Sequence, residues 1–144
     1  MQKAAQNGIV RIEGQPFADV QQALCAEIVI ATAEEIVEEQ ELRQEPERNL
    51  IPYFAVKYIC HVPLGAHPYA VFNCYDYDPL HLKRYHDSAE TDEAFQQYLA
   101  EFVYGVENHA EYLEAVGGAM RLETLRADPD YGYRLDLKRR RMNG

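Results

Sequence analysis

Two short stretches of the sequence carry side chains that could take part in chemistry. In the first, Glu34 and Glu35 come directly after the apolar run "EIVIAT", whose β-branched residues predict a buried strand. In open α/β sheets, ligands bind outside the carboxyl ends of the strands, so both carboxylates are predicted to face a substrate crevice. The alternative is that the two acids lie in a solvated crossover, in the first turn of a helix.

The second stretch is "GAHP", residues 65–68, inside a segment without a charged side chain from Val62 to Tyr75. Glycine permits close approach of the backbone to a ligand, and a histidine ring offers both a donor and an acceptor. We therefore count Gly65, Ala66 and His67 with the two glutamates as candidate substrate-binding residues. We expect His67 to lie on a concave surface with one ring nitrogen free. The alternative is a loop packed against its own tyrosines, with both ring nitrogens bonded inside the protein.

Other kinds of site are not indicated. The sequence contains no glycine-rich phosphate loop of the Rossmann or P-loop type, no Cys-x-x-Cys pair and no His-x-x-x-His pair. We therefore expect no metal and no bound cofactor, and we assign no catalytic residue. Cys25, Cys60 and Cys74 are odd in number and lie in or beside apolar runs, which is typical of reduced thiols in a cytoplasmic protein.

Composition predicts one globular domain, residues 1–133, followed by a basic tail, residues 134–144. The chain has 144 residues and is 47% hydrophobic, and no apolar run approaches the roughly 20 residues that a membrane span requires. The net charge of −10 disfavours nucleic acid as a partner, because phosphate binding needs lysine and arginine. The run "KRRR" in the tail could contact a phosphate, but such a run is more often solvated or bound to an acidic partner.

The order of the expected elements indicates an α/β fold with a helical C-terminal part. A strand at residues 8–14, a helix and the strand at residues 27–32 form a βαβ pattern, and a further strand is expected within residues 50–63. Because the strand at 27–32 is apolar on both faces, we expect it to be covered on both sides. Three strands are few for such a sheet, so the missing ones should come from another chain or from an N-terminal portion.

The remainder of the sequence predicts at least three helices. Residues 79–88 form the first candidate. Thr91 is placed as the N-cap of the next helix, which should end at Gly105, and Asn108 is placed as the N-cap of a third, which should end at Gly117.

Four segments, in this order, resemble the C-terminal half of the glutaconate type of A subunit in the class I CoA-transferase family. They are "VIATAEEIVEEQEL", "NLIPYFAVKYICHVPLGAHP", "YDYDPLHLKRY" and "FVYGVENHAEYLEAVGG". The resemblance covers nearly the whole chain, and its specific part is "GAHP" followed at this spacing by "YDYD". The acidic "EEIV" after a strand is also similar to the shorter 3-oxoacid CoA-transferase subunits.

The resemblance implies a partial CoA-transferase-like (NagB/RpiA-like) sheet and a role in moving CoA between acyl groups. In that family the reacting glutamate belongs to the partner chain, the B subunit, while a glycine-rich loop near the CoA lies in the N-terminal half of the A subunit. Neither has a match here, so the chain is expected to be inactive alone. It would form part of an acyl-CoA site beside a B-like chain, in a homo- or hetero-oligomer, with the CoA thioester as substrate rather than cofactor.

Two other functions fit the same residues. One is a subunit of a hydrolase that cleaves the ring of a cyclic CoA thioester on this scaffold. The other is a module without catalytic activity that binds a partner chain.

Overall fold

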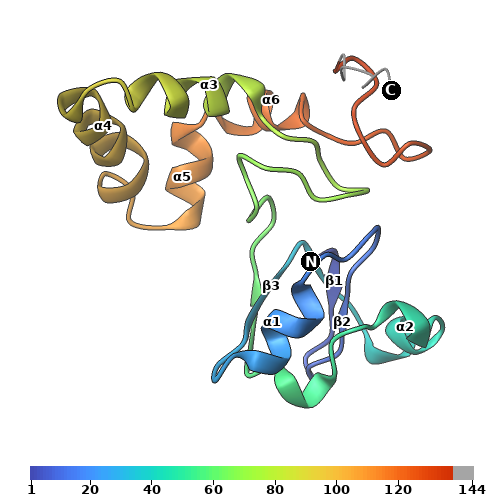
Figure 1. Ribbon diagram of the computed structural model, residues 1–144. Helices are drawn as coiled ribbons and strands as arrows, with labels where there is room; N and C mark the ends of the chain where they lie inside the picture. The colour runs from blue at the N-terminus through green and yellow to red at the C-terminus, as the bar shows by residue number, and fades with distance from the viewer. Residues whose placement is uncertain (138–144) are drawn as a thin grey trace, which may run out of the picture. The chain divides into compact units, whose positions relative to one another are not determined.

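The computed structural model describes residues 1–137, which form two compact units. Unit 1 comprises Met1–Ala66 and Val71–Cys74, and unit 2 comprises His67–Ala70 and the chain from Tyr75 onward (Figure 1). The basic run at residues 138–141 lies outside the described part of the chain. The assignment of residues 1–133 to a single domain stays a prediction.

Unit 1 contains short strands and short helices. They are β1 (Lys3–Ala4), β2 (Val10–Arg11), α1 (Asp19–Cys25), β3 (Ile30–Ala33), β4 (Glu35–Ile36), α2 (Glu39–Arg43), the 3₁₀ turns η1 (Pro46–Arg48) and η2 (Tyr53–Ala55), and β5 (Tyr58–His61). The predicted strand, helix and strand of the first 33 residues are present as β2, α1 and β3, and the next predicted strand is β5. The predicted βαβ unit is wrong, because β2 and β3 belong to different sheets and β2 pairs antiparallel with β1.

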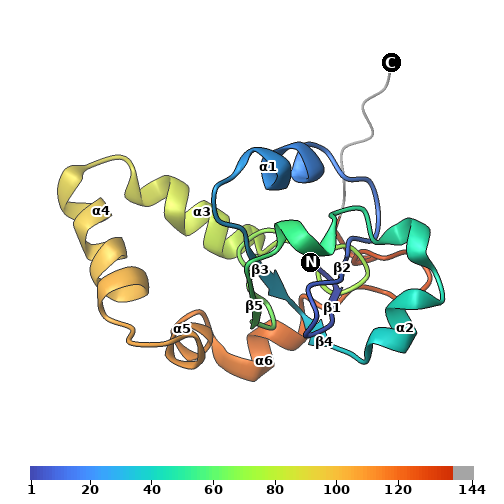
Figure 2. The ribbon, with the colours of Figure 1, turned by 90° about the horizontal axis from the view of Figure 1, so that it is seen from below.

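The strands β3 and β4 follow one another with only Glu34 between them. β3 pairs in parallel with β5, whereas β4 pairs in parallel with β1, which in turn pairs antiparallel with β2 (Figure 2). The β3–β4 segment thus joins two small sheets. Parallel pairing places the carboxyl ends of β3 and β5 beside each other. The candidate residues predicted from the sequence follow these two strand ends.

The core of unit 1 is built mainly from small and β-branched side chains on one side of β3 and from the inner face of α1. Its buried members are Ala4, Val10, Ala23, Ala31, Ala33 and Ile51. The prediction that β3 is covered on both faces is wrong for the residues described. Ala31 and Ala33 are buried, but Ile28 and Ile30 on the opposite face are 59% and 61% exposed, because the core and α1 cover only the alanine side.

Unit 2 is helical, as predicted. Its elements are α3 (Pro79–Ser88), α4 (Asp92–Leu99), the π-helical turn η3 (Ala100–Tyr104), α5 (His109–Ala115) and α6 (Gly118–Glu123). Thr91 accepts a hydrogen bond from the Ala94 amide and Asn108 accepts one from the Glu111 amide, which confirms both predicted N-caps. Together the two units make a mixed α/β protein. None of the helices in residues 1–137 is long and apolar enough to cross a membrane.

Candidate functional site

Glu34 lies at the carboxyl end of β3 and reaches across to the chain that leaves β5. Its Oε2 accepts a hydrogen bond of 2.7 Å from the Leu64 amide, and its carbonyl oxygen lies 3.1 Å from His61 Nε2. Leu64 has a positive φ of 60°, and the Gly65 amide donates to the Val62 carbonyl at 3.0 Å, so the chain turns sharply here. The structure therefore brings Glu34 and the turn of Gly65 together, as the rule for strand ends predicts.

Glycine is required at this turn by close packing. A Cβ built on Gly65 would lie 2.7 Å from the Val62 carbonyl oxygen, a distance that side-chain carbons do not adopt. Ala66 follows the turn and is exposed. The backbone after β5 is thus held near the Glu34 carboxylate by a turn that has no room for a side chain.

Glu35 has a different environment. It lies in β4, its side chain is exposed, and its Oε2 is 3.7 Å from Lys3 Nζ. It lines an open groove of about 520 Å³ together with Glu38, Glu39 and Glu41. Four carboxylates in one groove disfavour an anionic ligand such as a phosphate, since like charges repel. The pairing of Glu34 with Glu35 as neighbours on one crevice stays a prediction.

We expect Glu34→Ala to lower the free energy of unfolding by about 1–2 kcal/mol, because the Leu64 amide loses a charged acceptor in a partly buried turn. Glu35→Ala is the matched control, and it should change stability by less than about 0.5 kcal/mol because its ion pair is exposed. Urea unfolding of both variants measures the difference. Equal losses would contradict the assignment of Glu34 to the turn.

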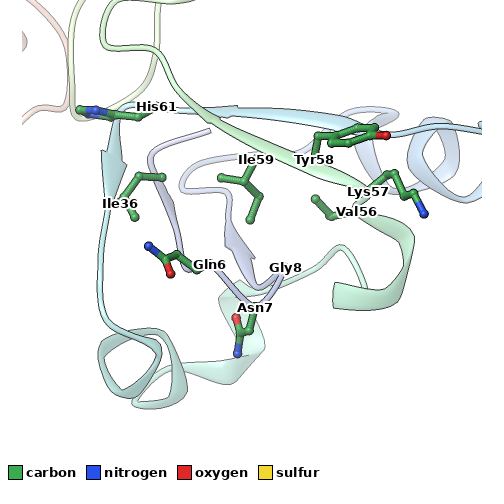
Figure 3. Close-up of a pocket in the computed structure, with 9 residues that line it drawn as sticks. All are labelled: Gln6, Asn7, Gly8, Ile36, Val56, Lys57, Tyr58, Ile59 and His61. Carbon is green, nitrogen blue, oxygen red and sulfur yellow. The ribbon is translucent and has the colours of Figure 1, made fainter.

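A second open groove of about 530 Å³ lies between the turn after β1 and the strand β5 (Figure 3). Ile59, Val56 and Ile36 supply apolar surface, and the side chains of Gln6 and Asn7 supply amides on the other side. A mixed lining of this kind suits a ligand with both polar and apolar parts. None of the five sequence-predicted residues lines this groove.

His67 belongs to unit 2, where its ring is buried and bonded on both sides. Nδ1 lies 2.7 Å from Tyr112 Oη, and Nε2 lies 3.3 Å from Asp78 Oδ2. The His67 side chain is 1% exposed. The expectation of a free ring nitrogen on a concave surface is therefore wrong. The physical reason is that Asp78, 11 positions away, and Tyr112, 45 positions away, provide one partner for each nitrogen.

Asp78 is the centre of this buried network. It caps α3 by accepting the amides of Leu80 and His81, and it also pairs with the Arg121 guanidinium. Burial by itself would raise the pKa of Asp78, but the hydrogen bonds from Arg121, the His81 amide and His67 outweigh it and lower the pKa to about 2. The carboxylate is therefore ionised at neutral pH. Nε2 of a neutral His67 then donates to it, and Nδ1 accepts from the Tyr112 hydroxyl.

A second histidine, His81, extends the network along α3. Its Nε2 lies 2.8 Å from Tyr98 Oη, and its ring stands 5.1 Å from that of His67. Burial is the main cause that lowers the pKa of both histidines. The Asp78 carboxylate raises the pKa of both histidines, but by less than burial lowers it. Both rings are therefore neutral at neutral pH.

Stability should fall as the pH drops below about 6.5. In the unfolded chain each histidine binds a proton near pH 6.5. In the folded state both pKa values are lowered, so protonation requires a lower pH. Acid therefore favours the unfolded state. His81→Gln should therefore reduce the loss of melting temperature between about pH 7.5 and about pH 5. His86→Gln, on the exposed side of the same helix, is the matched control and should leave the loss unchanged. An unaltered pH profile in His81→Gln would contradict this assignment.

Other candidates for chemistry are weaker. Burial raises the pKa of the Cys74 thiol to about 11, and burial raises the pKa of Tyr112 to about 12, so neither is a nucleophile at neutral pH. Cys25, Cys60 and Cys74 are free thiols. Within residues 1–137, no group of three or more His, Cys, Asp or Glu side chains is arranged to hold a metal ion.

The sequence contains one local signal for the buried network. Asp78 precedes Pro79 at the start of a helix, a pattern typical of an N-cap followed by a proline in the first turn. The partners Tyr112 and Arg121 carry no such local signal. Whether Glu34, Glu35, Gly65, Ala66 and His67 contact a substrate stays a prediction.

Comparison with known proteins shows strong similarity over nearly the whole chain. The A subunit of glutaconate CoA-transferase from Acidaminococcus fermentans is 40% identical over 136 residues, which cover 94% of this chain and 42% of the relative. An uncharacterized protein from Archaeoglobus fulgidus is 38% identical over 86% of this chain and 28% of its own length. The A subunit of 3-oxoadipate CoA-transferase from Pseudomonas knackmussii is 30% identical over 77% of this chain and 39% of its own length.

The fold agrees with the sequence comparison. The crystal structure of glutaconate coenzyme A-transferase from Acidaminococcus fermentans superimposes with a TM-score of 0.88, over 94% of this chain and 42% of the matched one. The matched region is the C-terminal half of the relative. This chain thus spans less than half the length of each of these relatives. No family model matches the sequence.

Proposed function

From its homology to the C-terminal half of CoA-transferase A subunits, we propose that this chain forms part of an acyl-CoA site and moves CoA between acyl groups together with a partner subunit. The observation that carries the proposal is 40% identity over 94% of the chain, joined to a TM-score of 0.88. The second named relative, from a 3-oxoadipate CoA-transferase, supports the same class of reaction.

In this proposal the chain binds and positions, and the partner supplies the reacting glutamate. The strand-end side chain Glu34 is engaged with the Leu64 amide, which suits a structural role better than attack on a thioester. Gly65 and Ala66 present a backbone turn without bulky side chains at the carboxyl ends of β3 and β5, where the acyl-CoA would lie. Glu35 is the remaining proposed substrate contact in unit 1, and because its groove disfavours phosphates it would contact the acyl-CoA away from the phosphate groups.

His67 has a narrower proposed role. Because both ring nitrogens are bonded within unit 2, it can act on a substrate only by fixing the backbone of residues 67–70. It would thereby be a positioning residue.

The test is co-expression of the 144-residue chain with a B-like partner chain, followed by an assay of CoA transfer from an acyl-CoA donor to glutaconate or 3-oxoadipate. These acids are chosen because they appear in the names of two relatives. The purified complex should transfer CoA, whereas this chain alone and the partner alone should not. Release of a ring-opened acyl-CoA would instead favour the hydrolase, and a stable complex without turnover would favour a binding module.

We also place the protein in the cytoplasm. The three cysteines are free thiols, and this state fits a reducing compartment. The proposed partner is a soluble B-like chain, and the oligomer would contain both.

A further inference from the structure

The hairpin that joins β1 to β2 carries an asparagine–glycine pair, Asn7 and Gly8, in its loop. The Ala5 amide donates to the Ile9 carbonyl at 2.9 Å, and the Gly8 amide donates to the Ala5 carbonyl at 3.1 Å. Gly8 has a positive φ of 97°, which is typical of a hairpin loop that ends in a left-handed glycine. Asn7 is exposed at the tip of this closed turn, so water reaches its side chain (Figure 3).

An asparagine followed by glycine can react with its own backbone, because glycine has no Cβ to shield its nitrogen. The Gly8 nitrogen attacks Asn7 Cγ and forms a C–N bond. The bond from Cγ to Nδ2 breaks, and Nδ2 leaves as ammonia with the proton that the Gly8 nitrogen gives up. Water then opens the resulting cyclic imide at either carbonyl. One opening gives aspartate, and the other gives isoaspartate, in which the backbone runs through the former side chain.

In the folded chain both reacting groups are held by hydrogen bonds. The Gly8 N–H, whose proton must leave, is bonded to the Ala5 carbonyl, and Asn7 Oδ1 accepts from the Ile9 amide at 3.2 Å. Attack requires Asn7 to rotate until Cγ meets the Gly8 nitrogen, and both hydrogen bonds oppose that rotation. The reaction should therefore proceed through an open form of the turn, which is a minor species in the folded protein.

The two products should affect the fold differently. Aspartate in place of Asn7 keeps an oxygen for the Ile9 amide and adds a negative charge to the groove that includes Glu35. Isoaspartate instead lengthens the loop by a backbone carbon. Gly8 has no room to move toward Tyr53, because a Cβ built on Gly8 would already lie 2.7 Å from the Tyr53 carbonyl oxygen.

The strands on either side of the loop give it little freedom to adjust. Ala4 and Val10 are partners in the β1–β2 register, both are fully buried, and both belong to the core of unit 1. A longer loop therefore has to displace core residues or lose the bonds that close the turn.

We propose that Asn7 is a deamidation site that the closed turn guards, and that isoaspartate formed there prevents the turn from closing as it does now. The co-reactant is water and the leaving group is ammonia. The inference concerns unit 1 alone and does not depend on the proposed function.

The experiment uses the 144-residue chain with the substitution Asn143→Ala, which removes the second Asn-Gly pair of the sequence. Samples are kept in mild alkali, either folded or in urea, and peptide mapping follows asparagine, aspartate and isoaspartate at Asn7. Deamidation of Asn7 should be at least roughly tenfold slower in the folded chain than in urea. Asn108, which is followed by His109, is the internal control and should react far more slowly than Asn7 in urea.

A second measurement compares the products after the urea has been removed. The isoaspartyl chain should fail to refold or melt at least about 5 °C below the unmodified chain. Asn7→Asp, the matched control for the added charge, should melt within about 2 °C of the unmodified chain.

Three results would overturn the proposal. Equal rates in the folded chain and in urea would show that the turn does not guard Asn7. An isoaspartyl chain that melts together with Asn7→Asp would show that the longer loop fits the fold. An Asn7 that stays unmodified in urea would show that it is not a deamidation site.

Discussion

Replacement of Asp78 with alanine should lower the free energy of unfolding of unit 2 by about 3–4 kcal/mol, the largest loss expected from a single substitution in this protein. The side chain of Asp78 is almost completely buried and has several donors: the amides of Leu80 and His81, the Arg121 guanidinium and His67 Nε2. Its removal takes away a helix cap and leaves a guanidinium without its carboxylate. Urea unfolding followed by circular dichroism measures the loss.

Two further variants separate the contributions. Asp78→Asn keeps an oxygen that can cap α3 but lacks the charge, so we expect an intermediate loss. Asp87→Ala is the matched control, because Asp87 lies on the same helix in an exposed pair with Lys83 and should cost less than about 0.5 kcal/mol. A loss in Asp78→Ala no larger than that of Asp87→Ala would show that the network does not support unit 2.

The same carboxylate should leave a signature in acid. The pKa of Asp78 is lowered from 3.8 to about 2 in the folded state, so its ionised form stabilises the fold above pH 3.8. That contribution, on the order of 2 kcal/mol, is lost as the pH falls from 3.8 through about 2. Asp78→Asn should lack this part of the acid transition.

The second large effect is expected in unit 1, where Arg11→Ala should cost about 3 kcal/mol. Arg11 is a strand residue of β2 with a 5% exposed side chain, and its Nη2 donates to the Leu42 carbonyl at 3.1 Å. Its Nη1 lies 3.3 Å from Glu45 Oε2. The guanidinium therefore joins β2 to the C-terminal end of α2 and the turn that follows. Loss of the side chain removes this buried link, although the Leu42 carbonyl still accepts from the Asn49 side-chain amide and Glu45 still pairs with Arg48.

Arg43→Ala is the matched control for this prediction. Arg43 lies on α2 and pairs with Glu39, but its side chain is 68% exposed, so its removal should cost less than about 0.5 kcal/mol. Arg11→Lys should not restore the loss, because a lysine lacks the planar fork that reaches several acceptors. Differential scanning calorimetry of the three variants tests this. Full stability of Arg11→Lys would contradict the role given to the guanidinium.

Features with a local signal can be predicted from the sequence. Thr91 and Asn108 are recognisable as N-caps because a cap bonds an amide only three residues away. The strand β3 follows from its apolar run, and Glu34 is placed at a strand end for the same reason. Pairings over long separations leave no such signal. β1 and β4 have two residues each, and their pairing with one another joins positions 32 residues apart.

In the candidate site, too, features with a local signal can be predicted and pairings over long separations cannot. The turn at Gly65 can be predicted from residue types, but its bond to Glu34 spans 30 positions. His67 is correctly expected outside the regular elements, yet its environment is not, because Tyr112 lies 45 positions away. The apolar run that forms β3 is typical of a strand covered on both faces, and the prediction of two buried faces follows from that pattern. Within residues 1–137 the apolar side chains on the second face of β3 are exposed, so the pattern alone does not predict their environment.

The central claim is that this chain supports CoA transfer without supplying the group that reacts. The most direct measurement uses the complex co-expressed with a B-like chain, incubated with acyl-CoA and then with hydroxylamine, which attacks a glutamyl thioester. Intact-mass spectrometry then shows which chain has been modified. The account predicts a modified partner chain and an unmodified 144-residue chain. Modification of the 144-residue chain, at Glu34 or any other glutamate, would contradict it.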